Sequence, residues 1–178
     1  RLNSTDLTTF IDIIYAGPQE FYRRRILQAP DEPANSSLIY GNIFHQVFEQ
    51  VTSHGITDEK AVELAIEKTL EAPLSTLEVA NLREKVQHGL KIALQDFSDI
   101  IRKPGAKAEI NLSSEHLTFD GIPITGKIDH INIDAQAKTI EVYDFKTGKY
   151  KDSKWEREPT LYKYALQLEF YKLMLNLS

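Results

Sequence analysis

The sequence predicts an α/β fold, layered like an α+β protein, with a central antiparallel or mixed β-sheet flanked by helices and an N-terminal helical region. Apolar residues recur at helical spacing through residues 1–103. From residue 106 to residue 145 the period falls close to two, with β-branched residues and turn signals. Helical spacing then returns near the end of the chain. This order of elements favours a sheet covered by helices.

The N-terminal part, residues 1–103, is predicted to be mainly helical. A first helical segment is expected at residues 4–27, because Ser4, Thr5 and Asp6 are capping residues, with a break at Gly17-Pro18. A loop rich in Pro, Ala and Ser should follow. The expected loop covers residues 28–37, and the expected later helices cover residues 39–53, 58–70 and 75–101, the last opened by a Ser75/Glu78 capping box.

The part from residue 104 to residue 178 is predicted to be a sheet followed by one helix, which together form the core of a single domain that spans residues 1–178. Asp120-Gly121 favours a tight hairpin turn, and Asp134–Ala137 is expected to form a second hairpin loop. The expected strands cover residues 107–113, 115–119, 122–133 and 138–146, and the expected final helix covers residues 159–177.

Composition limits the functions that are open to the chain. Its 178 residues contain no Cys, which excludes disulfides, cysteine nucleophiles and thiolate-held metal clusters, and which fits a cytoplasmic location. No apolar run is long enough to span a bilayer, so we expect no membrane partner. The net charge of −5 means that any nucleic-acid contact must use local basic groups. Because the chain opens on Arg1 without Met, we expect a fragment of a longer protein.

A carboxylate and an ammonium group end one face of the predicted strand 138–146. Alternation along a strand places Asp144 and Lys146 on the same face as Ile140 and Val142. The functional interpretation is a metal ligand beside a cation that serves a nucleophile or a developing negative charge. The alternative is an ion pair at a strand end, which is common.

A second carboxylate, Asp129, lies on the apolar face of the preceding strand. If residues 134–137 form the hairpin loop, residue 129 pairs with residue 142, and Asp129 and Asp144 become diagonal neighbours about 7–8 Å apart. Two such carboxylates repel each other unless a cation or a proton intervenes, and hard oxygen ligands suit Mg²⁺ or Mn²⁺. A polar patch at the end of the sheet is the alternative.

Two further residues extend this candidate site. Glu109, on a neighbouring strand, is either a third acid that binds metal or positions water, or a solvated strand residue. His45 is flanked by apolar residues and is either a metal ligand, oriented by Glu49 one turn later, or a hydrogen-bonded core histidine. The remaining histidines are expected to be structural: His54, His88, His116 and His130.

Basic and polar groups elsewhere could contact nucleic acid. Arg23 and Arg24 lie in one basic run and Lys149 in another, and each run either holds a phosphate backbone or forms a solvated face. Gln167 and Tyr171 share a face of the last helix, where they either contact a phosphate or a base or serve helix packing.

These residues occur in an order that resembles a known family. Five motifs follow one another along the chain: Gly41-x3-His45-x3-Glu49, Glu109, Gly126-x-Ile128-Asp129, Asp144-Phe145-Lys146-Thr147-Gly148 and Gln167-x3-Tyr171. Together they resemble the RecB-like branch of the PD-(D/E)XK nuclease superfamily, as in RecB-, AddA- and AddB-type helicase–nucleases. The opening residues 2–5 and the Pro18-x-x-Phe21-Tyr22 segment are also similar to the start of that nuclease domain.

The resemblance implies a restriction-endonuclease-like fold and a Mg²⁺- or Mn²⁺-dependent deoxyribonuclease, an exonuclease rather than an endonuclease. His45, Asp129 and Asp144 would ligate the metal with the backbone carbonyl of Phe145, and Lys146 would orient or activate the attacking water. The other matched residues keep the roles that the family gives them, Glu109 as an acid on an earlier strand and Gln167 and Tyr171 as support for the site and the DNA strand.

The implied partners are DNA, single-stranded by preference, and a helicase domain or subunit in double-strand break processing and recombinational repair. Many relatives carry an iron–sulfur cluster, but here Ala16-Gly17-Pro18 replaces the usual Cys-Pro, so we expect none. The alternatives are a catalytically inactive DNA-binding scaffold and a free-standing nuclease of a CRISPR or mobile-element system.

Overall fold

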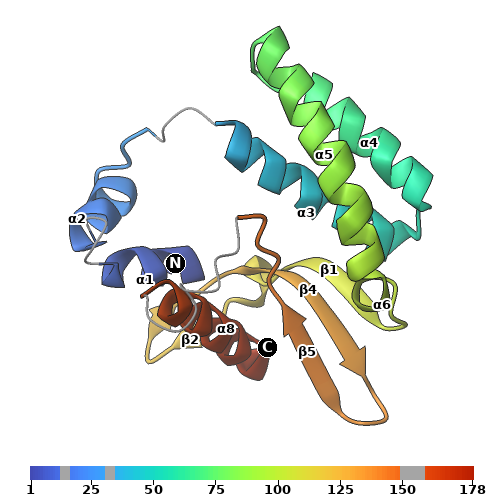
Figure 1. Ribbon diagram of the computed structural model, residues 1–178. Coiled ribbons are helices and arrows are strands. Elements are labelled where there is room, and N and C mark those ends of the chain that lie inside the picture. Colours follow the sequence, from blue (N-terminus) through green and yellow to red (C-terminus); the bar gives the residue numbers. More distant parts are fainter. Residues whose placement is uncertain (13–16, 31–34, 149–158) are drawn as a thin grey trace. The chain divides into compact units, whose positions relative to one another are not determined.

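The structure is a computed structural model that describes residues 1–12, 17–30, 35–148 and 159–178 (Figure 1). Its contacts divide the chain into two compact units. The first unit contains residues 1–33, 111–127 and 148–178, and the second unit contains residues 34–110 and 128–147. Each unit therefore takes segments from both sides of residue 103. The predicted class, helices with an antiparallel sheet, is confirmed.

The second unit contains four helices, and side chains cap the start of the first three. They are α3 (Ser36–His54), α4 (Asp58–Leu70), α5 (Thr76–Asp96) and α6 (Ser98–Ile101). The predicted Ser75/Glu78 capping box opens α5, with each side chain bonded to the backbone of the other residue. The Asn35 side chain accepts hydrogen bonds from two backbone N–H groups of the first turn of α3. This cap starts α3 before residue 37, so the predicted loop 28–37 was too long.

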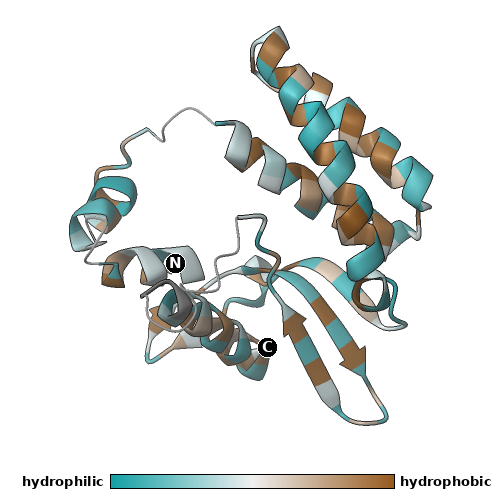
Figure 2. Cartoon of the chain, viewed as in Figure 1, coloured by the Kyte–Doolittle hydropathy of each residue, from teal (hydrophilic) through white to brown (hydrophobic). Residues whose placement is uncertain are grey.

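The core of the second unit lies between these helices. Brown and teal alternate along α4 and α5, which lie side by side, because each helix has one apolar face (Figure 2). The buried apolar residues of α3 are Ile43, Phe44, Val47, Phe48 and Val51, and those of α5 are Leu82, Val86, Leu90, Ala93 and Leu94. Phe145 packs against this core from the sheet side.

The larger sheet joins β1 (Ala106–Asn111), β4 (Lys127–Asp134) and β5 (Thr139–Tyr143) in the order β1-β4-β5. The β4–β5 pair is antiparallel. Just before β1, Gly105 approaches β4 closely, with a φ of 88° and its carbonyl accepting from the Ile133 N–H at 3.4 Å. A Cβ at residue 105 would lie 2.6 Å from the Ile133 carbonyl oxygen, so only glycine fits there.

The β4–β5 hairpin loop differs from the prediction by one residue at each end. Asp134 is still a strand residue and pairs with Thr139. Its carboxylate accepts from the backbone N–H groups of Gln136 and Ala137, at 2.9 and 2.8 Å, which stabilises the turn. Lys138 completes the loop in the left-handed conformation, with a φ of 53°.

This loop shifts the strand register by two residues from the predicted one, which was therefore wrong. Val142 pairs with Ile131 rather than with Asp129. If the register is continued to the residues that follow β5, Asp129 lies opposite Asp144, where the prediction had them diagonal. The observed register therefore places Asp129 and Asp144 closer together than the predicted one, because directly opposed residues are nearer than diagonal ones.

The first unit contains short elements and one long helix. They are α1 (Ser4–Ile11), α2 (Gly17–Phe21), a π-helix (Tyr22–Ile26), a 3-10 turn (Ser113–Glu115), β2 (Thr118–Phe119), β3 (Ile122–Pro123) and α8 (Pro159–Leu177). Asp120 and Gly121 have φ values of 50° and 75°, which confirms the predicted tight turn between β2 and β3. The predicted strands 115–119 and 122–133 were too long, because a left-handed His116 delays β2 and β3 ends at Pro123.

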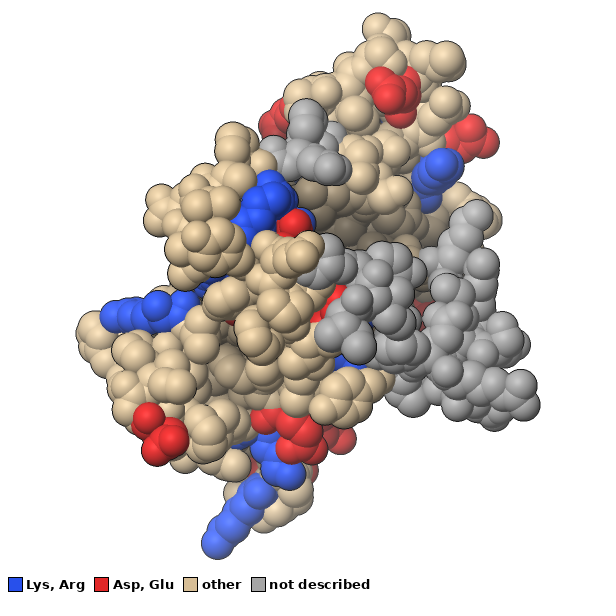
Figure 3. Space-filling model, turned by 90° about the vertical axis from the view of Figure 1, so that its left-hand side faces the viewer, with Lys and Arg blue, Asp and Glu red and all other residues tan. Residues whose placement is uncertain are grey.

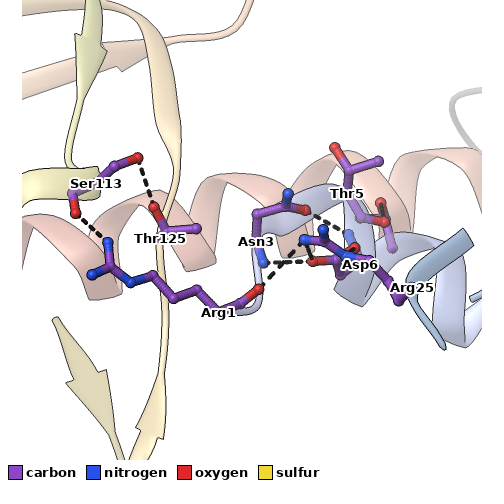
Figure 4. Close-up of polar contacts among 8 residues, drawn as sticks. Arg1, Asn3, Thr5, Asp6, Arg25, Ser113 and Thr125 are labelled. Carbon is purple, nitrogen blue, oxygen red and sulfur yellow. Dashed lines mark hydrogen bonds and ion pairs between the residues drawn. The ribbon is translucent and has the colours of Figure 1, made fainter. Parts of the chain in front are cut away.

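Polar contacts hold the start of the chain within the first unit (Figure 4). Asn3 caps α1 and forms a capping box with Asp6, so the cap lies one residue before the predicted set. The buried Asp6 carboxylate also pairs with Arg25 of the π-helix. Leu2 forms a parallel bridge with Ile124. Among the helices of the described ranges, none has the length and apolar character needed to cross a membrane.

Candidate metal centre

Among the described residues, three side chains that can ligate a metal converge in the second unit: His45, Glu109 and Asp129. Their candidate ligand atoms all lie within 4.8 Å of one another. His45 Nδ1 lies 3.4 Å from Glu109 Oε1 and 3.7 Å from Asp129 Oδ2. Three residues far apart in the sequence therefore offer one nitrogen and two carboxylates to a common point.

His45 reaches this point because α3 buries the residues on either side of it. Phe44 and Val47 face the core, and the His45 side chain stays 28% exposed at the edge of that face. The imidazole is therefore close enough to the sheet to meet carboxylates but is not enclosed by apolar groups. His45 therefore lies at the edge of the core rather than inside it, with its Nδ1 facing two carboxylates.

Glu109 reaches the cluster through an irregular backbone. Its φ of 54° lies in the left-handed region, in the middle of β1, and this conformation costs a non-glycine residue about 1–2 kcal/mol. Irregular strand positions of this kind redirect a side chain. The Glu109 side chain is only 9% exposed, so the solvated strand residue of the alternative interpretation is excluded.

The electrostatics of the cluster show an excess of negative charge. Burial, and then the charge of Asp144, raise the pKa of Asp129 to about 6, although His45 and the Phe145 N–H act in the opposite direction. The pKa of His45 is also raised, chiefly by its hydrogen bond with Glu109 and against the effect of burial. Both shifts mean that the site favours bound positive charge, which either protons or a metal ion can supply.

The Asp144-Phe145-Lys146 segment follows directly after β5 and adjoins the cluster. Lys146 Nζ lies 2.5 Å from Asp144 Oδ2, so the ion pair of the alternative interpretation is present. The Asp144 side chain is 9% exposed, and its charge acts on both Asp129 and His45, so the pair lies beside the cluster. Phe145 donates its N–H to Asp129 Oδ2 at 3.0 Å.

The predicted site residues Glu49, Gln167 and Tyr171 are not members of the three-residue cluster. Glu49 lies half-buried on α3, one turn after His45, while His45 Nδ1 lies within ion-pairing distance of Glu109 and Asp129. Gln167 and Tyr171 belong to α8 in the first unit, where Gln167 Nε2 donates to the Tyr171 hydroxyl at 2.6 Å. Their roles toward the centre stay predictions.

The basic residues proposed for DNA contact are already paired in part. Glu20 accepts from both Arg23 and Arg24, at 2.7 and 2.5 Å, and the two guanidinium groups lower its pKa to about 2. On the face drawn in Figure 3, Lys and Arg side chains occur in separate groups, with acidic side chains beside several of them. Lys149 lies outside the described residues.

The chemistry of the donor set fits a divalent metal ion. An imidazole nitrogen and carboxylate oxygens are ligands that divalent metal ions accept, and a cation would stabilise the charged Asp129, whose pKa is raised by burial and then by the charge of Asp144. The sequence prediction had Asp144 as a ligand and Glu109 as either a third acid that binds metal or positions water, or a solvated strand residue. In the structure Glu109 belongs to the three-residue cluster and Asp144 lies beside it, paired with Lys146.

Comparison with known proteins gives the family. The sequence model of the PD-(D/E)XK nuclease superfamily matches residues 11–178. Searches of curated proteins and of solved structures gave no match. The matched range includes the histidine, the acids and the lysine of the centre, and the helices with an antiparallel sheet are consistent with a restriction-endonuclease-like fold. The chain therefore belongs to the PD-(D/E)XK nuclease superfamily.

Proposed function

We propose that the chain is the RecB-like nuclease domain of a helicase–nuclease, and that it hydrolyses DNA phosphodiester bonds during the processing of double-strand breaks for recombinational repair. Membership of the superfamily implies nuclease activity. The observation that carries the proposal is the His45–Glu109–Asp129 cluster, with the Asp144–Lys146 pair beside it. Exonuclease action on single strands is part of the proposal, as are a cytoplasmic location and the absence of an iron–sulfur cluster.

Mg²⁺ or Mn²⁺ is the proposed cofactor. His45, Glu109 and Asp129 would hold it, with Asp144 and the backbone carbonyl of Phe145 as the further ligands that the motif order suggests. When bound, such an ion lowers the pKa of a water ligand and offsets charge on the scissile phosphate. The partly exposed His45 side chain gives the cluster access to solvent, which a substrate phosphate needs for entry.

Lys146 is the proposed catalytic cation. Its ammonium group is fixed by Asp144 at 2.5 Å, and the side chain is 41% exposed, so it can also reach a phosphate or a water in the open part of the site. There it orients the nucleophile and stabilises the negative charge that develops on phosphate oxygens. Asp144 therefore has two functions in this proposal, because it adds charge to the centre and holds Lys146.

The first unit supplies the proposed DNA support. Arg23, Arg24 and Lys149 are assigned to strand binding on their residue types. Gln167 and Tyr171 are assigned to support of the site and the DNA strand, and Glu49 to orientation of His45. Because Glu20 already neutralises much of the Arg23–Arg24 charge, we expect these arginines to contribute less to DNA affinity than their number suggests.

Cleavage assays on end-labelled single-stranded, duplex and circular DNA test the proposal. The wild-type protein should degrade linear single strands with Mg²⁺ or Mn²⁺ and stop in EDTA. Asp144→Ala and Lys146→Ala should lose this activity. Lys103→Ala is the matched control, because Lys103 is also 41% exposed and pairs with a carboxylate, Glu141, at 2.6 Å.

The outcomes separate the parts of the proposal. Variants at Asp144 and Lys146 that cut as fast as wild type contradict the assigned centre. Metal-independent DNA binding without cleavage by the wild-type protein contradicts the nuclease and indicates a scaffold instead. Cleavage of circular DNA contradicts the exonuclease assignment, and a complete protein or complex without ATP-driven unwinding contradicts the helicase link.

A further inference from the structure

The side chain of Phe145 is surrounded by aromatic rings from three other segments of the second unit. The ring centroids of Phe48, Phe97 and His130 lie 4.8, 5.5 and 5.8 Å from that of Phe145. The planes cross at 76°, 60° and 62°, which are edge-to-face arrangements. Contacts of this geometry are directional, so they fix the orientation of a ring as well as its depth.

Three segments of the candidate centre have a residue in or next to this ring cluster. On α3, Phe48 follows His45 by three residues and so lies on a neighbouring part of the same helix surface. On β4, His130 directly follows Asp129 and is fully buried on the opposite face of the strand. Phe145 itself separates Asp144 from Lys146.

The backbone of the Asp144–Lys146 segment needs a support of this kind. Pairing of β5 with β4 ends at Tyr143, so the strand ladder does not hold the residues that follow. The Phe145 N–H donates to Asp129 Oδ2, and the Phe145 ring packs into the cluster. These two contacts anchor the middle residue of the segment, with its side chain turned into the core.

We propose that Phe145 is a positioning residue, and that Phe48, Phe97 and His130 form with it an aromatic clamp that sets the spacing between His45, Asp129 and Lys146. The inference rests on the proposed active centre. The clamp acts from the core side, where it touches neither metal nor substrate. Small displacements of reacting groups have large effects on rate, so a ring lost here should affect catalysis beyond its effect on stability.

Matched substitutions separate positioning from general core packing. Phe48→Leu removes a ring partner of Phe145, whereas Phe44→Leu removes an equally buried ring of the same helix that packs on Tyr40 and Phe48 instead. Phe97→Leu tests the clamp at a 37% exposed side chain, where a folding defect is least expected. Phe145→Leu tests the central ring directly.

Three quantities are measured for each variant: amide hydrogen exchange in the metal-free protein, Mn²⁺ affinity by calorimetry, and kcat and KM for DNA cleavage. In the Phe48, Phe97 and Phe145 variants, protection of the residue 145 amide and Mn²⁺ affinity should each fall about tenfold, and kcat about tenfold to a hundredfold with KM nearly unchanged. In Phe44→Leu the amide protection, the Mn²⁺ affinity, kcat and KM should stay within about threefold of wild type. This should hold even if the urea midpoint of Phe44→Leu falls as much as that of the other variants.

Loss of activity in proportion to the urea midpoint in all four variants overturns the clamp, because it shows core packing alone. Wild-type protection of the residue 145 amide in Phe97→Leu and Phe48→Leu also overturns it. That exchange measurement is made without metal, so it decides the clamp even if the wild-type protein binds no Mn²⁺. Failure of the wild-type protein to bind Mn²⁺ contradicts the proposed centre, and this outcome is distinct from the exchange result that decides the clamp.

Discussion

Phe145 donates its backbone N–H to Asp129 Oδ2 at 3.0 Å, across the β4–β5 hairpin. The bond joins a ligand candidate on β4 to the segment that carries Asp144 and Lys146. The Asp129 carboxylate is largely buried and lies close to the negative charge of Asp144. These two effects raise its pKa to about 6, although the hydrogen bond acts in the opposite direction. Burial disfavours the charged form of this carboxylate, and a bound cation would favour it. Both effects can be measured without a nuclease assay.

Asp129→Asn should make the metal-free protein more stable at neutral pH, by about 1–2 kcal/mol. The amide removes the charge that burial and Asp144 disfavour, yet it can still accept from the Phe145 N–H. Urea unfolding measures the change. With Mn²⁺ present the order should reverse, because only the wild-type protein gains stability from the ion. A substitution that destabilises the metal-free protein contradicts this explanation.

The stability that Asp129 and His45 contribute to the metal-free protein should fall as the pH rises from about 4 to about 8. For Asp129 and His45 the pKa in the folded state lies above the ordinary value. Each contribution is therefore present at low pH and is lost as the pH rises, from 3.8 to about 6 for Asp129 and above 6.5 for His45. Denaturation across this range, with Asp129→Asn as the reference, should show a smaller decline in the variant. An equal decline in both proteins would contradict the assignment to Asp129.

Lys146→Ala should separate catalysis from metal binding. Removal of one positioned cation from a developing charge commonly costs about 10²–10³ in rate. We expect a loss of this size in kcat, with a Mn²⁺ affinity within about threefold of wild type, because the lysine is not a ligand candidate. Parallel loss of metal affinity would show instead that Lys146 is needed to build the centre.

Glu109→Gly should be more stable than Glu109→Ala by about 1 kcal/mol. Both changes remove the carboxylate, but only glycine accepts the φ of 54° without a Cβ penalty. Thermal unfolding of the pair in the absence of metal measures the difference, and both should bind Mn²⁺ more weakly than wild type. An alanine variant as stable as the glycine variant would show that the backbone relaxes at residue 109.

Local chemistry made much of the fold predictable. The helix 58–70 and the final helix 159–177 begin and end at the predicted residues, and the Ser75/Glu78 capping box is present. The Asp120-Gly121 turn follows from the need for two positive φ values. Each of these features depends on residues close together in the sequence, which is why a single sequence is sufficient to predict them.

Contacts between distant residues limited the prediction of the site. The hairpin register was wrong because the Asp134 carboxylate stabilises the turn from inside the strand end, which moves the loop to residues 135–138. The sequence analysis left Glu109 open between a third acid and a solvated residue, because the left-handed backbone that accompanies its entry into the cluster has no local sequence signal. The pairing of Glu20 with both Arg23 and Arg24 was also not predicted, because the sequence analysis considered the run of arginines without the acidic residue one helical turn before it.

The central claim is that His45, Glu109 and Asp129 form a divalent-metal centre. Anomalous diffraction from a crystal of the protein grown or soaked with Mn²⁺ tests it most directly. The account predicts one peak within coordination distance of His45 and the carboxylates of Glu109 and Asp129. An ion bound only elsewhere, or a Mn²⁺-saturated protein with these three side chains far apart, would contradict it.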